Sequence, residues 1–436
     1  MLTLIAKALK KTNNVKRSSY IWNAINATMS AAQSPVILMV MTRTNGIYDA
    51  GIFSIAFAVA YLMLHVGQYG LRRFQSSDIT EKYTFGEYHG VRIMTGVAML
   101  LASGAYCVYG LLFKDYSASK FTVIFLICGL KCIQAYADVY HGRLQQVGRL
   151  DIAAKASSVR YVIEMAVYAG MLIITQDLLI STAVCLAISV ITLLVTTVNV
   201  SRGFCTLRPS FEAMKMKLLF FNGFPLFVSL FLNVYISNVP KYAIDAYLTE
   251  EIQAIYNLIF MPAFMVQLIA HFIFNPIITT YAELWLAGEY SKFRKLVNLI
   301  KKQCLLVLGL AILGLAIAFT IGIPVLSLIF GVDLSDYKAE LCVIMAGGGA
   351  LAYATFFSTV ITIIRAQFSL LICYGATALA AKGLSGIVVQ NHGIMGAAAI
   401  YYVLMGILAV VLFIITVIKL RTQGRNLTTP PEFLCF

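Results

Sequence analysis

Long apolar stretches recur along the whole chain, separated by short polar segments. Each spans about 18 residues or more, enough for a helix to cross roughly 30 Å of hydrocarbon. Such stretches can be drawn at approximately 19–41, 50–70, 93–113, 121–140, 158–175, 178–200, 218–240, 252–279, 303–330, 341–364, 367–389 and 393–418. The pattern predicts an all-α polytopic membrane protein with about twelve transmembrane helices.

The polar segments divide these stretches into two sets of six. The predicted parts are a basic N-terminus (1–18), an N-terminal six-helix bundle (19–200), a linker (201–217), a C-terminal six-helix bundle (218–418) and a tail (419–436). If the N-terminus is cytoplasmic, the lysines and arginines of alternate loops favour the cytoplasmic side by about four to one. Both termini and the linker are therefore predicted to be cytoplasmic.

Composition agrees with a membrane protein. The 436 residues are 60% hydrophobic and 12% charged, with a mean hydropathy of +0.84, far outside soluble usage. The net charge of +14 is explained mainly by the loop asymmetry, so we expect no nucleic-acid partner.

Sequence signatures of catalysis are missing. The chain has no G-x-S-x-G, P-loop or H-E-x-x-H motif, and its nine cysteines include no C-x-x-C. The predicted outer loops are too short for a large extracytoplasmic active site. We therefore expect no catalytic residue, no metal site and no cofactor.

A polar stripe interrupts the fourth apolar stretch. Its members are spaced three or four residues apart, on one helix face: Lys131, Gln134, Asp138, His141 and Gln145. A charge within a membrane span costs about 2.5–3.5 kcal/mol on insertion scales, which favours a cavity-facing position or a partner. Lys131 and Asp138 lie about 10 Å apart along the helix, so we expect them to have different partners.

Further charges lie in or near other spans. Glu164 follows Arg160 by four residues, which permits an intrahelical ion pair but also leaves a cavity-wall position open for Glu164. The seventh stretch is predicted to be interrupted at Pro240, followed by Lys241 and Asp245 near the outer surface.

The two halves repeat weakly. Phe53 and Tyr256 open equivalent stretches with an offset of 203 residues, as expected for two six-helix repeats of the same orientation with a substrate cavity between them. The run Gly347–Gly349 inside a span is expected to allow close helix packing or local unwinding.

Three segments carry a resemblance to a known family. Residues 69–92, 137–151 and 238–277 resemble Wzx-type oligosaccharide flippases of the multidrug/oligosaccharidyl-lipid/polysaccharide exporter superfamily, and the similarity extends over nearly the whole chain. The resemblance implies a MATE-like, V-shaped pair of bundles in the bacterial cytoplasmic membrane. It also implies alternating-access transfer of a polyprenyl-diphosphate-linked glycan to the outer leaflet, for O-antigen, capsule or teichoic-acid synthesis beside other polysaccharide-assembly proteins.

Such a substrate would need cationic and hydrogen-bonding groups in a cavity. The predicted cavity cations are Lys131, Arg43, Lys241 and Arg365. The predicted sugar-binding groups are Gln134, Asp138, His141 and Gln145. Headgroups could gather at a basic cytoplasmic mouth of Arg72, Arg73, Arg143 and Arg149, although loop topology explains these arginines about as well.

The sequence alone does not decide which energy source drives transport. The membrane potential alone could drive export of an anion and return of an emptied cationic site, at about 2.3 kcal/mol per charge per 100 mV. If a sodium or proton gradient is used instead, the expected coupling residues are Asp138, Glu164 and Asp245. The alternatives to a glycan flippase are a lipid II flippase, a multidrug/cation antiporter, a membrane glycan polymerase or ligase, and a scaffold of glycan assembly.

Overall fold

The structure is a computed structural model that describes residues 2–78, 81–274, 278–287, 289–364 and 366–428. These residues are almost wholly helical, with no β-strand among them. The chain divides into two compact units: Met1–Val234 with Thr249–Ala254, and Tyr235–Leu248 with Ile255–Phe436. The domain limits given above remain predictions.

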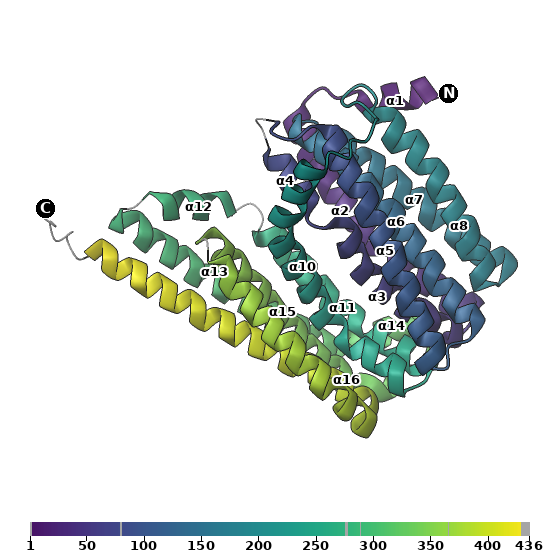
Figure 1. Cartoon of the computed structure of the whole chain (residues 1–436). Helices are drawn as coiled ribbons and strands as arrows, with labels where there is room; N and C mark the ends of the chain where they lie inside the picture. Colours follow the sequence, from purple (N-terminus) through teal and green to yellow (C-terminus); the bar gives the residue numbers. More distant parts are fainter. Residues whose placement is uncertain (1, 79–80, 275–277, 288, 365, 429–436) are drawn as a thin grey trace, which may run out of the picture. The chain divides into compact units, whose positions relative to one another are not determined.

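The first unit is a helical bundle. Its helices are α1 (Leu2–Lys10), α2 (Val15–Thr44), α3 (Ile47–Gln68), α4 (Leu71–Ser77), α5 (Phe85–Phe113), α6 (Ala118–Gln146), α7 (Leu150–Thr175) and α8 (Leu178–Thr192). A π-helical stretch η1 (Leu193–Val198) and α9 (Asn199–Ser201) extend α8, and α10 (Ala213–Tyr247) follows the linker. Helix α6 contacts α3, α5, α7 and α8, and α5 to α8 run side by side (Figure 1). The polar stripe on α6 is therefore surrounded by other helices.

Polar caps fix where several of these helices begin. Asp177 caps α8 and Ser117 caps α6, each through a side-chain oxygen that accepts a backbone N–H of the first turn. Thr84 and Glu87 form a reciprocal capping box at the start of α5. The caps satisfy backbone N–H groups that have no partner within the helix, and so mark where each helix begins.

The second unit contains the remaining helices. They are α11 (Glu250–Phe274), α12 (Ile278–Leu286), α13 (Tyr290–Ile317), the π-helical η3 (Ala318–Gly322), α14 (Ile323–Phe330), the 3₁₀ turn η4 (Ser335–Tyr337), α15 (Lys338–Ile363) and α16 (Gln367–Thr428). The first turn of α11 belongs to the first unit, and the last part of α10, residues 235–247, belongs to the second. Helix α16 contains a break at Gly393, with φ 55° and ψ −137°, which separates two helical arms.

The glycine run packs against three neighbouring helices of the second unit. Helix α15 stays helical throughout the run. A β-carbon on Gly347 would lie 2.5 Å from Tyr401 of α16, one on Gly348 2.8 Å from Ala263 of α11, and one on Gly349 2.9 Å from Ala311 of α13. The expectation of close helix packing is confirmed, and local unwinding does not occur.

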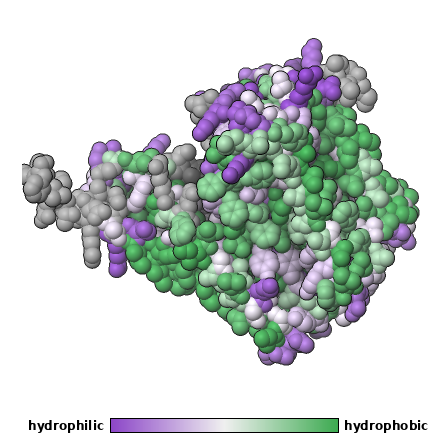
Figure 2. Space-filling view, viewed as in Figure 1, coloured by the Kyte–Doolittle hydropathy of each residue, from purple (hydrophilic) through white to green (hydrophobic). Residues whose placement is uncertain are grey.

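The apolar surface of the helices agrees with a membrane protein. Ten helices among the described residues are long and apolar enough to span a membrane. These ten count α16 as one helix despite its break at Gly393, and they do not include α11. Leu101 and Ile173 are 69% and 57% exposed on the flanks of α5 and α7, and apolar side chains cover much of the visible face (Figure 2). The predicted all-α polytopic fold class is confirmed.

One sequence expectation about a helix is wrong. Helix α10 passes through Pro240 without interruption and ends seven residues later at Tyr247. A proline removes a single backbone donor, and Ile244 O still accepts the N–H of Leu248 at the end of the helix. The charges that follow Pro240 are therefore helical rather than part of a loop.

Candidate functional site

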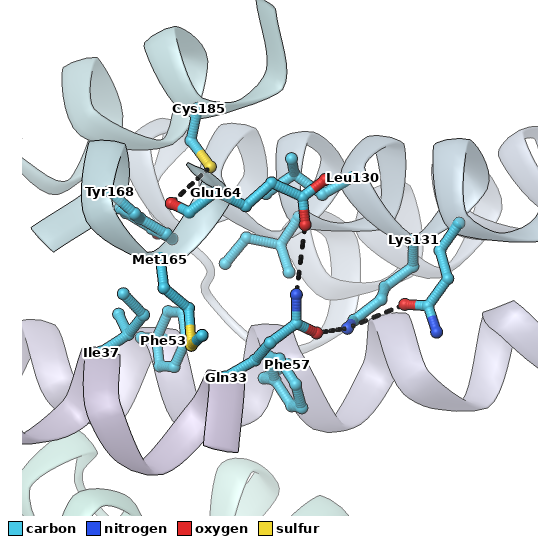
Figure 3. A pocket seen from close by; sticks show the side chains of 12 residues that line it. Gln33, Ile37, Phe53, Phe57, Leu130, Lys131, Glu164, Met165, Tyr168 and Cys185 are labelled. Carbon is cyan, nitrogen blue, oxygen red and sulfur yellow. Dashed lines mark hydrogen bonds between the residues drawn. The ribbon is translucent and has the colours of Figure 1, made fainter. Parts of the chain in front are cut away.

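The main polar cluster of the first unit surrounds a small pocket near the middle of α6. Helices α2, α3, α6, α7 and α8 each contribute to its lining (Figure 3). The lining residues are Gln33, Ile37, Phe53, Phe57, Ile127, Leu130, Lys131, Gln134, Glu164, Met165, Tyr168 and Cys185. Most of the wall is apolar or aromatic, so its few polar groups decide what the pocket can hold.

Lys131 is buried and its ammonium group has three partners. The Nζ atom donates to Gln33 Oε1 at 2.9 Å and to Gln134 Oε1 at 3.2 Å. It also lies 4.5 Å from the centre of the Phe57 ring, a cation–π geometry. Two amide oxygens and a ring face thus replace the water that this charge would otherwise hold.

Gln33 connects the lysine to a carboxylate. Its amide nitrogen donates to Glu164 Oε2 at 3.2 Å while its oxygen accepts from Lys131. Figure 3 shows this bridge between α6 and α7. An ammonium group can only donate hydrogen bonds and an ionised carboxylate can only accept them, so the two groups together fix which way the Gln33 amide points.

Glu164 has further partners on its own helix and on α8. Ser189 Oγ donates to Glu164 Oε1, and Arg160 Nε lies 3.5 Å from the same oxygen. The two alternatives left open by the sequence therefore occur together: Glu164 pairs with Arg160 within α7 and also lines the pocket.

The pocket is too small for a sugar. Its volume available to the centre of a water molecule is about 40 Å³, whereas one water needs about 10–15 Å³ of such space. A few waters or a small cation fit beside Lys131 and Glu164. The space is unsuited to an oligosaccharide.

Asp138 belongs to a separate ionic cluster further along α6. Arg92 Nη2 donates to Asp138 Oδ2 at 3.0 Å, and Arg72 Nη1 lies 3.4 Å from Oδ1. Arg92 is fully buried and also donates to Gly67 O. The prediction that Lys131 and Asp138 have different partners is confirmed.

Arg92 is not among the site residues predicted from the sequence. It lies two turns inside α5 and is buried. The sequence does contain a signal for this position: the T-x-x-E pattern at Thr84–Glu87 is typical of a helix start and places Arg92 inside the helix. Gln33 was also missed, although an amide inside a predicted span is itself a signal.

The part of the stripe near the C-terminal end of α6 contacts neighbouring helices. His141 is buried and its Nε2 lies 3.2 Å from Ser157 Oγ on α7. Gln145 Oε1 accepts from Arg72 Nε at 3.2 Å. The stripe is thus divided among three environments: the pocket, the Asp138 cluster and the contact with α7.

The four arginines of the predicted cytoplasmic mouth differ in their contacts. Arg143 donates to Glu81 at 2.7 Å and to Phe204 O at 3.0 Å. Arg149 donates to Asp151 at 2.9 Å and to Lys10 O at 2.9 Å. The Arg73 residue is exposed, and the side chain of Arg72 is 32% exposed. Arg143 and Arg149 thus hold loops and the N-terminal segment in place, while Arg72 and Arg73 are accessible.

The remaining predicted site residues lie apart from the pocket. In the second unit, the ammonium of Lys241 donates to Asn257 Oδ1 at 2.6 Å and lies 4.6 Å from the centre of the Phe260 ring. Asp245 follows one turn later on α10 and is half-buried, and Arg43 is exposed in the last turn of α2. Arg365 lies outside the described residues.

Across the described part of the chain, no three His, Cys, Asp or Glu side chains come together in a way that could hold a metal ion.

Comparisons with known proteins give a fold. Neither the protein-family models nor the curated protein sequences contain a match. A solved inward-facing multidrug resistance MATE family transporter of the MOP superfamily matches with a TM-score of 0.65 and 13% identity, covering 97% of this chain and 99% of that one. The chain has a MATE transporter fold.

Two further solved structures agree. The Vibrio cholerae MATE transporter VcmN in its bent form matches with a TM-score of 0.58 and 15% identity, over 97% of this chain and 99% of that one. A MATE transporter in the bent conformation matches at 0.57 and 12%, over 98% and 99%. At these identities the likeness concerns the fold, and it extends over the whole length of each chain.

Proposed function

We propose that the protein is an alternating-access transporter that moves a polyprenyl-diphosphate-linked glycan from the cytoplasmic to the outer leaflet of the bacterial cytoplasmic membrane. The observation that carries the proposal is the arginine pair around Asp138. Two guanidinium groups share one carboxylate, so this cluster retains a positive charge. Its outer member, Arg72, is partly exposed.

A diphosphate is suited to this position. It is an anion with several acceptor oxygens, and guanidinium groups bind such oxygens with paired N–H donors. The Arg72–Asp138 contact of 3.4 Å is long for a charge-assisted hydrogen bond. A phosphate oxygen can therefore compete for Arg72, while Arg92 remains buried and holds Asp138.

The pocket has a different role in this proposal. Because it holds only waters or a small cation, Lys131 and Glu164 serve the conformational cycle rather than direct contact with the sugar. The glycan itself requires a larger cavity. The membrane potential favours outward movement of the anionic headgroup by about 2.3 kcal/mol per charge per 100 mV.

A cellular experiment tests the substrate. Deletion of the gene is expected to cause a lipid-linked glycan to accumulate with its sugars on the cytoplasmic side, and to abolish surface glycan. Complementation with Arg72→Gln should restore surface glycan at about one tenth of the wild-type rate or less, since a charge-assisted hydrogen bond contributes about 1.5–3 kcal/mol and 1.4 kcal/mol is tenfold. Arg17→Gln is the matched control, because Arg17 is an exposed arginine near the start of α2. Wild-type glycan levels in the deletion strain would contradict the proposal.

A second candidate is a multidrug or organic-cation antiporter. The matched fold includes transporters described as multidrug resistance proteins, and Glu164 shares its pocket with the rings of Phe53, Phe57 and Tyr168, groups whose chemistry attracts organic cations. Two observations count against this candidate: the pocket has room only for waters or a small cation, and the Lys131 ammonium already occupies it. Sensitivity of the deletion strain to lipophilic cations, with normal surface glycan, would favour this candidate.

A further inference from the structure

The groups around Lys131 Nζ have the chemistry of a small cation site. Two amide oxygens lie at 2.9 and 3.2 Å, and an aromatic ring face lies at 4.5 Å from its centre. The Glu164 carboxylate does not touch the ammonium directly but is connected to it through the amide of Gln33. Oxygen ligands and a nearby negative charge are what bound monovalent cations use in membrane proteins.

The position that such a cation would take is already occupied. The ammonium of Lys131 receives the oxygen ligands, and its stem reaches the site from the middle of α6. Glu164 lies opposite on α7, with one oxygen engaged by Gln33 and the other by Ser189 and Arg160. The arrangement resembles a cation site whose cation is covalently attached to the protein.

We propose that the Lys131 ammonium acts as a tethered cation, which occupies a monovalent-cation site formed by Gln33, Gln134 and Glu164. The protein therefore does not bind sodium at this site. Shortening the lysine opens the site to a free monovalent cation. The mechanistic meaning rests on the proposed transport function: the return of the empty carrier would respond to the membrane potential through this fixed charge rather than through a sodium gradient.

The second unit provides a comparison for the design of the test. Phe57 and Phe260 are related by the same 203-residue offset as Phe53 and Tyr256. A lysine ammonium lies over each of these two rings. Lys241, however, donates to the neutral amide of Asn257. Lys241→Ala therefore also removes a buried lysine over a phenylalanine, and tests whether any such deletion creates a cation response.

Thermal unfolding in detergent tests the proposal without any transport substrate. Wild type, Lys131→Ala and Lys241→Ala are compared in sodium, methylammonium and choline chloride at equal concentration. The Tm of Lys131→Ala is expected to rise in sodium or methylammonium relative to choline, on the order of 5 °C at saturation. Wild type and Lys241→Ala are expected to show the same Tm in all three salts.

Lys131→Met serves as a volume control, because its side chain refills the space without a charge. It is expected to show no response to sodium or methylammonium. If Lys131→Ala is aggregated in choline but monodisperse in methylammonium, the proposal is supported.

Two results would overturn the tethered cation. One is a sodium-induced rise in the Tm of wild type, which would mean that the site binds a free cation beside Lys131. The other is a Lys131→Ala variant, folded or not, that behaves alike in all three salts. Because neither readout depends on a glycan, failure of the proposed substrate and failure of the tethered cation can be told apart.

Discussion

Lys131 and Lys241 are two buried lysines over equivalent phenylalanines, but they differ in what compensates their charge. The rings lie at 4.5 and 4.6 Å from the two ammonium groups. In the first unit, Gln33 forms hydrogen bonds to both Lys131 and Glu164, beside a small cavity. In the second unit, the lysine donates to Asn257. The same lysine–aromatic contact is thus part of an ionic network in one half and a neutral hydrogen bond in the other.

We propose that the charge of Lys131 is kept for function, whereas packing merely tolerates that of Lys241. A buried ion pair is weak evidence for stability, because apolar replacements are often as stable. A charge held together with a carboxylate and open space points instead to a role in which the network changes during the cycle. The following predictions address that difference.

The largest expected effect is the loss of the carboxylate in the first unit. Glu164→Ala leaves the Arg160 guanidinium, in a residue only 1% exposed, without its acidic partner, so we expect a loss of about 3–5 kcal/mol in the free energy of unfolding. Asn257→Ala should cost less, about 1–3 kcal/mol, because only a neutral acceptor is removed. Chemical unfolding in detergent measures both.

Glu212→Ala is the control for Glu164. Glu212 pairs with Lys215 at 3.2 Å, but its side chain is 53% exposed, so its removal should change stability by about 0–1 kcal/mol. If Glu164→Ala lowered the free energy of unfolding as little as Glu212→Ala, the ionic network around Lys131 would make no measurable contribution to stability.

An intermediate effect is expected when each lysine becomes methionine. Lys131→Met leaves the half-buried amides of Gln33 and Gln134 without their donor and removes a charge that Gln33 links to Glu164, at a cost of about 1–3 kcal/mol. Lys241→Met loses one hydrogen bond but also removes a buried charge that costs about 2.5–3.5 kcal/mol on insertion scales, so the net change should lie within about 1 kcal/mol of zero. Equal destabilisation by the two substitutions would remove the distinction between the two lysines.

The smallest expected effect concerns the rings. Double-mutant cycles between Lys131→Met and Phe57→Leu, and between Lys241→Met and Phe260→Leu, should each give a coupling of about 0.5–2 kcal/mol. The two couplings should agree because the two ring distances agree. A coupling found in one half alone would show that the shared geometry has no common energetic value.

The fold could be predicted from the sequence further than the site. Apolar length is a local quantity, and it predicted the polytopic helical class and the positions of most helices. The separate partners of Lys131 and Asp138 also followed from helical spacing alone. Pro240 shows the limit, because a helix tolerates a single missing donor when its remaining hydrogen bonds are formed.

The partners themselves were beyond sequence reasoning. Gln33 is 98 residues from Lys131 and Arg92 is 46 from Asp138, and no spacing rule relates residues on different helices. Their contacts depend on how α2, α5, α6 and α7 pack. The sequence thus identified the polar groups on α6 that require partners, while packing decided which distant residues meet them.

The most direct test of the proposed function is translocation in proteoliposomes. Purified protein is reconstituted with the lipid-linked glycan that accumulates in the deletion strain, and transfer is followed as loss of access to a membrane-impermeant reagent that modifies sugars. We expect wild type and Arg17→Gln to translocate the glycan at equal rates, and Arg72→Gln to do so at least about tenfold more slowly. Translocation no faster than in protein-free liposomes, together with uptake of a lipophilic cation by the same vesicles, would contradict the proposed function.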